Sequence, residues 1–93
     1  MHQPGEKGGR FVIQRDGRDV AELAYTGNGQ LVTLVHTEVD PIMRGTGAGK
    51  TLVDEAVHWA RQEGKRVAAT CPYAKSVLDK TPEYHDVFDA GPA

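Results

Sequence analysis

The sequence has little of several residue types, and each shortage excludes a class of protein. Its one cysteine, Cys71, leaves no partner for an internal disulfide and no Cys/His cluster for structural zinc. Aromatic residues make up only 6% of the chain, and the 11 basic residues, set against 13 acidic ones, form no basic run. We therefore expect no metal site and no nucleic-acid partner.

Long apolar runs are also missing. No stretch approaches the roughly 20 apolar residues of a membrane span, and the N-terminal residues MHQPGEKGGR lack the apolar segment of a signal peptide. A single free thiol is typical of a reducing compartment. We therefore expect a cytoplasmic protein with no membrane partner.

The length of 93 residues leaves room for one small domain. A P-loop nucleotidase needs a larger parallel sheet, a metal-binding acidic strand and switch loops, and these do not fit. Residues 1–9 are polar and rich in glycine, so we expect a flexible N-terminal tail there. Residues 10–93 then form the single domain.

Alternating apolar residues predict strands in the first half of the chain. They run from Arg10 to Gln14 and from Asp19 to Tyr25, and the intervening Asp16-Gly17 is a strong hairpin signal. A third strand, LVTLVHTEV at 31–39, is apolar on both faces in its first half, as expected for a central strand. The three strands predict an antiparallel meander.

After residue 40 the apolar period changes from two to about 3.6. An apolar stripe from Leu52 to Ala60 predicts a helix that ends at Gly64, a favoured left-handed cap. RVAATC at 66–71 predicts a short strand, and a second helix is expected from Pro72 to about Asp79. A strand, helix and strand in this order form a βαβ crossover. The expected fold is therefore a mixed α/β (α+β) sheet with a three-strand antiparallel meander, a crossover and a C-terminal helix.

The segment RGTGAGKT at 44–51 is close to the phosphate loop of nucleotidases but fails at one position. That loop needs a glycine, four residues and then Gly-Lys-Ser/Thr, and the position of its first glycine is occupied here by Arg44. The glycines still let a ligand approach the backbone, and the free N–H groups at a helix start attract phosphates. The segment is thus either a phosphate site or a flexible connection into the helix.

Arg44-Gly-Thr-Gly-Ala-Gly49 matches Arg/Gln-x-x-Gly-x-Gly/Ala, the pyrophosphate-binding motif of the GNAT superfamily of acetyl-CoA-dependent N-acetyltransferases. Its companions are HTEV at 36–39, the amphipathic helix, Cys71-Pro72-Tyr73 and Pro82-Glu83-Tyr84. Together they resemble the small, single-domain YjdJ-type members, over about residues 10–88. The resemblance implies a GNAT-like fold, acetyl-CoA (coenzyme A) as cofactor, and an amine acceptor that is either a small molecule or a protein, in a monomer or weak dimer.

The resemblance also implies which residues bind the coenzyme. Main-chain amides of the glycine loop would hold the pyrophosphate; the loop residues are Arg44, Gly45, Thr46, Gly47, Ala48, Gly49 and Lys50. Lys50 either adds charge near the phosphates or is a solvated helix residue. The pantetheine arm would pair with the strand end that includes Thr37 and Val39, as a substitute strand does. The Val39 N–H is the expected oxyanion donor.

Aminolysis of a thioester needs a group that takes the proton of the amine and an acid for the departing thiolate. His36 and Glu38 lie two apart on one strand and therefore share a face. Either relays a proton, or they are a packed histidine and an ordinary solvated carboxylate. Tyr73 is either the general acid or a residue that packs on the coenzyme. Tyr84 is expected to anchor the C-terminal loop.

Cys71 precedes a proline that suits the first position of a helix. The positive end of the helix dipole lowers the pKa of a thiol placed there. Cys71 is therefore either a nucleophile that accepts the acyl group and passes it on, or a small residue that closes a strand.

Two departures from the family concern the acceptor. The chain lacks the extra N-terminal helices that wall the acceptor site in larger GNAT enzymes, and Thr81 stands where the resemblance leads us to expect histidine. Two functions therefore compete. One is an N-acetyltransferase that acts on an unidentified amine, and the other is a coenzyme A or acyl-CoA binding module without turnover.

Overall fold

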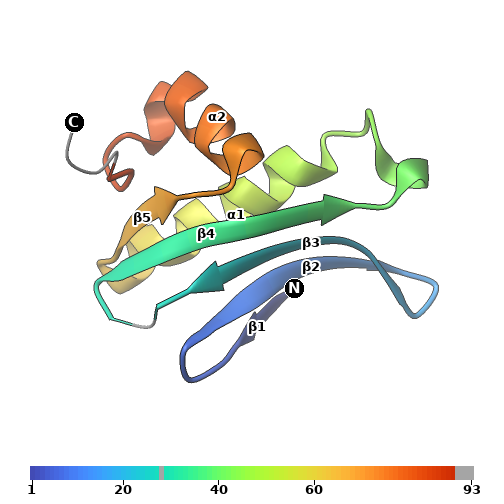
Figure 1. The fold of residues 1–93 in the computed structure, drawn as a ribbon, viewed down its shortest axis with the longest axis horizontal. Coiled ribbons are helices and arrows are strands. Elements are labelled where there is room, and N and C mark those ends of the chain that lie inside the picture. The colour runs from blue at the N-terminus through green and yellow to red at the C-terminus, as the bar shows by residue number, and fades with distance from the viewer. Residues whose placement is uncertain (28, 90–93) are drawn as a thin grey trace.

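The structure of the protein is a computed structural model that describes residues 1–27 and 29–89. Within these residues one sheet contains, in spatial order, β1 (His2–Pro4), β2 (Gly8–Arg15), β3 (Arg18–Thr26), β4 (Leu31–Val39) and β5 (Arg66–Ala69). Neighbouring strands run antiparallel from β1 to β4, and β5 runs parallel to β4 (Figure 1). The predicted mixed α/β sheet, with its meander and crossover, is confirmed.

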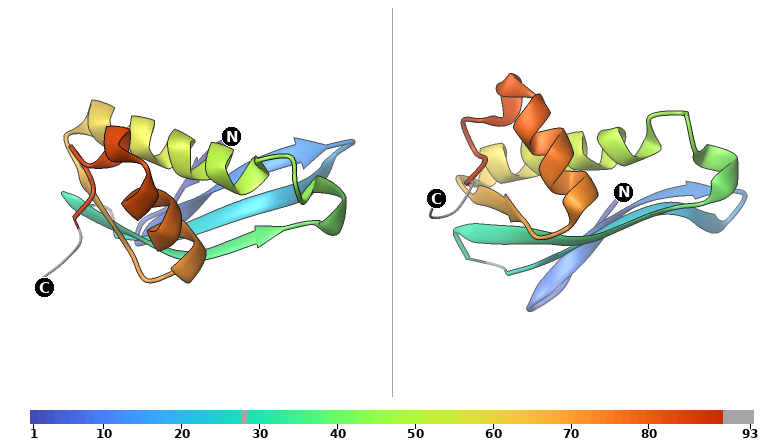
Figure 2. Two further views of the ribbon diagram at one scale, coloured as in Figure 1. Left: turned by 90° about the horizontal axis from the view of Figure 1, so that it is seen from above. Right: turned by 45° about the horizontal axis from the view of Figure 1, so that its top comes forward.

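Two helices cover one face of this sheet (Figure 2). They are α1 (Ala48–Glu63) and α2 (Pro72–Lys80), and two short 3-10 turns are η1 (Pro41–Met43) and η2 (Pro82–Tyr84). As predicted, α1 ends at Gly64, whose φ of 67° is left-handed and whose N–H bonds back to the last turn. No helix in the described part of the chain is long and apolar enough to cross a membrane.

The core lies between the sheet and the two helices. Phe11, Leu23 and Leu34 from the sheet form one buried cluster with Leu52 on α1 and Leu78 on α2. The buried residues of α1 follow the helical period, which is why the sequence pattern located this helix. Each fully buried large apolar side chain contributes roughly 1.5–3 kcal/mol. This layer therefore fixes α1, and with it the start of α1, on the sheet.

The N-terminus differs from the sequence prediction. A flexible tail was expected over residues 1–9, but β1 pairs antiparallel with β2, with His2 opposite Phe11. The His2 ring stacks on the Phe11 ring at a centroid distance of 4.3 Å, and its Nε2 lies 2.6 Å from the Tyr25 hydroxyl. Trp59 of α1 lies edge-on to the same histidine. The prediction is wrong for these residues because contacts with distant aromatic rings, rather than a local apolar pattern, hold the strand.

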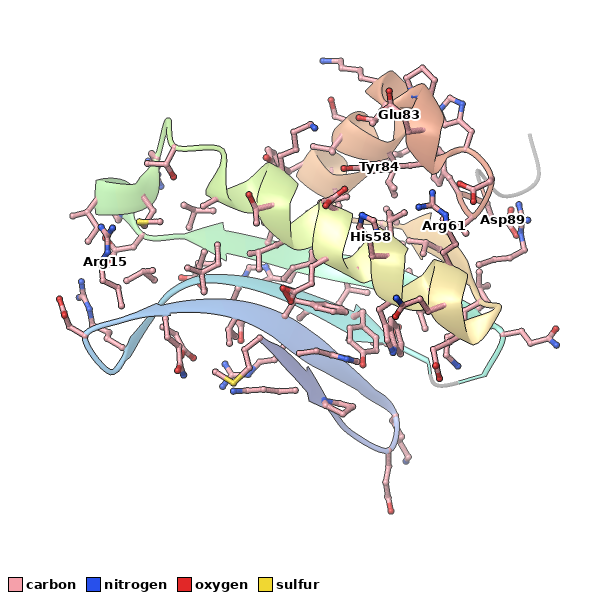
Figure 3. The ribbon with its side chains drawn as sticks, turned by 180° about the vertical axis from the view of Figure 1, so that it is seen from behind. Arg15, His58, Arg61, Glu83, Tyr84 and Asp89 are labelled. Atoms are coloured by element: carbon pink, nitrogen blue, oxygen red, sulfur yellow. The ribbon has the colours of Figure 1, made fainter. Side chains whose placement is uncertain are left out.

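The C-terminal segment lies alongside α1 and returns to the sheet, and Figure 3 labels Tyr84, Arg61 and Asp89 on this side. The Tyr84 hydroxyl donates to the Asp54 carboxylate at 2.8 Å, and Arg61 donates two hydrogen bonds to Asp86, each 2.8 Å long. Phe88 forms a parallel bridge with Val67, which brings the chain back to the edge of the sheet. Tyr84 is only 5% exposed, as an anchoring residue should be. Residues 90–93 of the predicted domain lie outside the described residues.

The bond between Tyr84 and Asp54 predicts a pH-dependent stability. Burial, followed by the hydrogen bond to Asp54, raises the pKa of Tyr84 to about 12, whereas an unfolded tyrosine has a pKa of roughly 10. Stabilisation by the neutral phenol is therefore complete below about pH 10 and is lost as the pH rises through about 12. We expect Tyr84→Phe to lower the free energy of unfolding by about 1 kcal/mol near neutral pH.

Urea unfolding of both proteins across the pH range measures this effect. The difference between wild type and Tyr84→Phe should shrink between about pH 10 and pH 12, because only the wild type titrates at this position. A difference that stays constant over that interval would show that the phenol is not responsible.

Candidate functional site

A glycine turn joins η1 to α1. Gly45 and Gly47 have φ angles of 82° and 81°, which other residues adopt only at a cost. A Cβ at either position would meet nothing within 4 Å, so backbone conformation selects glycine there and the space beside the loop is open. The Thr46 hydroxyl donates to the carbonyl of Met43 and closes the turn. The loop is therefore held in a fixed shape with its backbone accessible.

The loop ends at a helix start suited to an anion. Gly47 is the N-cap of α1 and supplies no side-chain hydrogen bond, and the first turn contains no acidic residue. The N–H groups of this turn and the positive end of the helix dipole thus face outward without a side-chain acceptor. A pocket of about 170 Å³, here named the loop pocket, lies at this end; it is lined by Val39, Met43, Arg44, Gly45, Gly47, Ala48, Gly49 and Tyr73.

Three residues of the predicted cofactor set, Thr37, Thr46 and Lys50, do not line the loop pocket. The Lys50 Nζ lies 6.0 Å from the centroid of the Tyr84 ring, toward the C-terminal segment. The structure therefore brings Arg44, Gly45, Gly47, Ala48 and Gly49 together around the loop pocket and favours the solvated reading of the lysine.

Strands β4 and β5 diverge beside this pocket. Their pairing ends at Leu34 and Ala69, where the N–H groups of Thr70 and Cys71 both donate to the Leu34 carbonyl, at 3.0 and 3.2 Å. The chain then turns into α2, while β4 continues to Val39. Beyond Leu34, this edge of β4 is paired with no strand of the described residues, which leaves backbone groups for an extended ligand.

A bulge in β4 determines which side chains face the helices. Ala24 of β3 lies opposite His36, but Tyr25 lies opposite Leu34, so Val35 is an extra residue in β4. After the bulge, Thr37 is paired with the core residue Leu23 and faces the helices. The sequence analysis did not detect this bulge, because it depends on pairing register rather than on local composition.

His36 and Glu38 lie on the opposite, open face of the sheet. As predicted they share this face, with side chains 60% and 73% exposed, and His36 Nε2 lies 3.5 Å from Glu38 Oε2. Glu38 is directly opposite Glu22 of β3, and Arg10 forms an ion pair with Glu22. Neither Arg10 nor Glu22 was identified from the sequence; their polar positions on paired strands are the signal that indicates them.

A larger pocket of about 480 Å³ lies beside Glu38, and we name it the open-face pocket. It is lined by Arg10, Asp19, Val20, Ala21, Glu22, Thr37, Glu38, Val39, Asp40, Pro41 and Arg44. Arg10, Glu22 and Glu38 belong to the face that the helices leave uncovered. Val39 and Arg44 line both pockets, so the end of β4 forms the boundary between them.

Cys71 is the N-cap residue of α2 and is 8% exposed. Its Sγ lies 3.4 Å from the Thr37 hydroxyl, a partner that the sequence analysis missed because the bulge sets it. Burial alone raises the pKa of the Cys71 thiol, but the hydrogen bond with Thr37 and the N–H groups of Ala74, Tyr73 and Thr37 outweigh burial and lower it. The Cys71 side chain forms no capping hydrogen bond with α2. The N–H groups of the helix therefore lower the pKa of the thiol as oriented dipoles that face the sulfur.

Comparison with known proteins gives a consistent result. The family model described as GCN5-related N-acetyl-transferase matches residues 10–87. A solved structure from Staphylococcus aureus, a GCN5-like protein assigned as an N-acetyltransferase, has 27% sequence identity to this chain and a TM-score of 0.73. The match covers 99% of this chain and 90% of the S. aureus chain. Comparison with curated protein sequences yields no significant match.

Two more distant structures share the fold. The ribosomal-protein-S18-alanine N-acetyltransferase from Escherichia coli has 19% identity and a TM-score of 0.68, with coverage of 81% of this chain and 52% of that one. The aminoglycoside N-acetyltransferase AAC(6')-Iy, solved in complex with CoA, has 17% identity and a TM-score of 0.60, with coverage of 81% and 66%. This chain thus spans about half the length of the E. coli enzyme.

The contact between Thr37 and Cys71 predicts the reactivity of the thiol. Thr37→Val removes the hydroxyl but leaves Cys71 buried, so the pKa of the thiol should rise and its alkylation near neutral pH should slow. Iodoacetamide labelling followed across pH by intact mass measures this directly, because the chain has one cysteine. Thr33→Val is the matched control, since Thr33 lies on β4 between the core residues Val32 and Leu34 and faces away from the helices. An unchanged labelling profile in Thr37→Val would show that the Thr37 hydroxyl does not lower the pKa of Cys71.

Proposed function

Because the chain belongs to the GCN5-related N-acetyltransferase family, we propose that it transfers the acetyl group of acetyl-CoA to an amine. The observation that carries the proposal is the pair of pockets that meet at Val39 and Arg44. One is bounded by a glycine loop and a helix start, and the other by a carboxylate on an open sheet face. A donor and an acceptor can therefore approach the same strand end from two sides.

The residues of the loop pocket fit the coenzyme. The open space beside Gly45 and Gly47 admits a pyrophosphate against main-chain amides, and the start of α1 favours its negative charge. The unpaired edge of β4, with Thr37 and Val39, offers a strand partner to the amide-bearing pantetheine arm. Acetyl-CoA bound in this way supplies an activated thioester. The CoA complex of AAC(6')-Iy supports this choice of cofactor.

The backbone of Val39 is oriented for a role at the thioester carbonyl. The Asp40 N–H donates to the Val20 carbonyl of β3 at 2.8 Å. Successive N–H groups along a strand point to opposite edges, so the Val39 N–H points away from β3, toward the unpaired edge. We assign it as the donor that stabilises negative charge on the carbonyl oxygen, a role in which a fixed dipole contributes several kcal/mol of barrier reduction.

The open face supplies the proton acceptor. Glu38 lines the open-face pocket and directly precedes Val39 in the chain. Its carboxylate therefore accepts the proton of an amine that enters from that side. His36, 3.5 Å from Glu38, can pass the proton to solvent. The named acceptors of the two distant neighbours, a ribosomal-protein alanine and an aminoglycoside, differ in size, so the fold alone selects no acceptor.

A covalent route is a second candidate, favoured by the lowered pKa of Cys71. In this route the Cys71 sulfur attacks the acetyl carbonyl, the bond to the coenzyme sulfur breaks, and the coenzyme leaves as a thiolate that takes up a proton. The amine then attacks the acetyl-cysteine and regenerates the Cys71 thiolate, while its own proton goes to Glu38 or solvent. Direct transfer needs no bond to Cys71.

Coenzyme A binding is tested with two matched glycine variants. Gly17 in the hairpin and Gly47 in the loop have φ angles of 78° and 81°, and a Cβ at either meets nothing within 4 Å. Substitution by alanine should therefore cost each a similar amount of stability, about 1 kcal/mol. Only Gly47→Ala should lose affinity for coenzyme A, measured by calorimetry and by the shift of the melting temperature.

Saturating coenzyme A, at 100 times its Kd, should stabilise the wild type by about 2.7 kcal/mol, and ATP with magnesium should not. Equal affinity in Gly47→Ala and Gly17→Ala would overturn the loop assignment. Equal stabilisation by ATP would restore the nucleotidase reading.

Turnover is tested by transfer of label from acetyl-CoA to a panel of amines and proteins. Glu38→Gln should lower the rate roughly 10²-fold or more without changing coenzyme affinity, whereas Glu63→Gln, at the exposed end of α1, should be silent. Binding without transfer to any acceptor would indicate a binding module instead. Intact mass after incubation with acetyl-CoA separates the routes: an adduct lost in Cys71→Ala supports the covalent one, and full activity in that variant supports direct transfer.

A further inference from the structure

Gly49 differs from the other two glycines of the loop. It lies inside the first turn of α1, where glycine is less favourable than alanine by roughly 0.5–1 kcal/mol, and its backbone is not left-handed. A Cβ built there would lie 2.6 Å from Tyr73 Oη, 2.7 Å from Cε2 and 2.8 Å from Cζ. Real Cβ atoms essentially never lie this close to other atoms, so the end of the Tyr73 side chain rests on the main chain of Gly49 and a Cβ would push it away. Glycine at this position leaves room for the ring where it now lies, whereas the backbone conformation does not call for glycine.

Tyr73 has few other restraints on its side chain. It belongs to the first turn of α2, is 45% exposed, and its hydroxyl makes no hydrogen bond with the described residues. An exposed aromatic ring at the rim of a pocket, held mainly by packing on a glycine, is well placed to contact a ligand. The ring belongs to the lining of the loop pocket, together with Gly47 and Gly49 from the loop side and Val39 from the strand side.

We propose that Tyr73 is a cofactor-positioning residue, seated on Gly49, that guides the pantetheine arm from the phosphate loop to the free edge of β4. The inference rests on the proposed function. An arm that begins at the loop and ends at Val39 crosses the pocket that the ring lines. The flat apolar face supports the chain and excludes water on that side, and neither effect uses the hydroxyl. The aromatic ring, not the phenol proton, is therefore the functional part of the residue.

A double-mutant cycle tests the pair. Gly49→Ala should displace the ring and weaken coenzyme A binding about tenfold, the effect of losing one good aromatic contact. In the Tyr73→Ala background the same substitution should have no further effect, because the new methyl group enters vacated space. Tyr73→Phe should keep the affinity of the wild type.

Adenosine bisphosphate, the nucleotide half of coenzyme A without the arm, is the control ligand. Its affinity should be the same in the wild type and in Tyr73→Ala, since the ring contacts only the arm. Thermal unfolding checks that each variant folds. The double variant Gly49→Ala, Tyr73→Ala should be more stable than Tyr73→Ala alone, because alanine favours the helix more than glycine does.

Three results would overturn the inference while leaving the proposed function intact. One is an equal loss on Gly49→Ala in both backgrounds, and another is a parallel loss of adenosine bisphosphate affinity in Tyr73→Ala. The third is a Tyr73→Phe variant that binds coenzyme A normally but turns over as slowly as Tyr73→Ala, which would make the hydroxyl an acid. By contrast, a wild type that binds no coenzyme A would refute the proposed function itself.

Discussion

The carbonyl group of Leu34 is the point from which the site is organised. It accepts the N–H groups of both Thr70 and Cys71, so the pairing of β5 with β4 stops there and the chain turns into α2. Where this pairing stops, one edge of the end of β4 is left without a strand partner among the described residues, while its other edge stays paired with β3. The same turn places Cys71 beside Thr37 and sets Tyr73 of α2 against Gly49 of α1. Moving the end of β5 by one residue would alter all three relations at once, since side chains alternate between faces along a strand.

Most of the architecture could be predicted from the sequence because local patterns of apolar residues and glycines determine it. The period of two marked the three long strands, the change to 3.6 marked α1, and Gly64 marked its end. Strand β1 could not be predicted, because a histidine stacked on Phe11 and edge-on to Trp59 is a contact between residues far apart in the chain. The hydropathy of a short segment does not depend on such contacts and cannot predict them.

For the same reason, the parts of the candidate site that depend on local spacing were predicted and those that depend on strand pairing were not. The loop and the shared face of His36 and Glu38 follow from spacing alone, and the structure shows both. The bulge at Val35 is a property of two paired strands, and it alone turns Thr37 toward Cys71. The three glycines of the loop look alike in the sequence, yet Gly45 and Gly47 have a left-handed backbone, whereas Gly49 is helical and leaves room for the Tyr73 ring.

Both helices lie on one side of the sheet (Figure 2), and Arg10, Glu22 and Glu38 of the open-face pocket belong to the other side. In the proposed reaction, the coenzyme occupies the helix side and the acceptor stays on the uncovered side, with only the end of β4 between them. The acceptor never has to enter the interior, so its size is not limited by a cavity wall. In the proposed reaction the two ligands therefore approach the end of β4 through separate openings that share Val39 and Arg44.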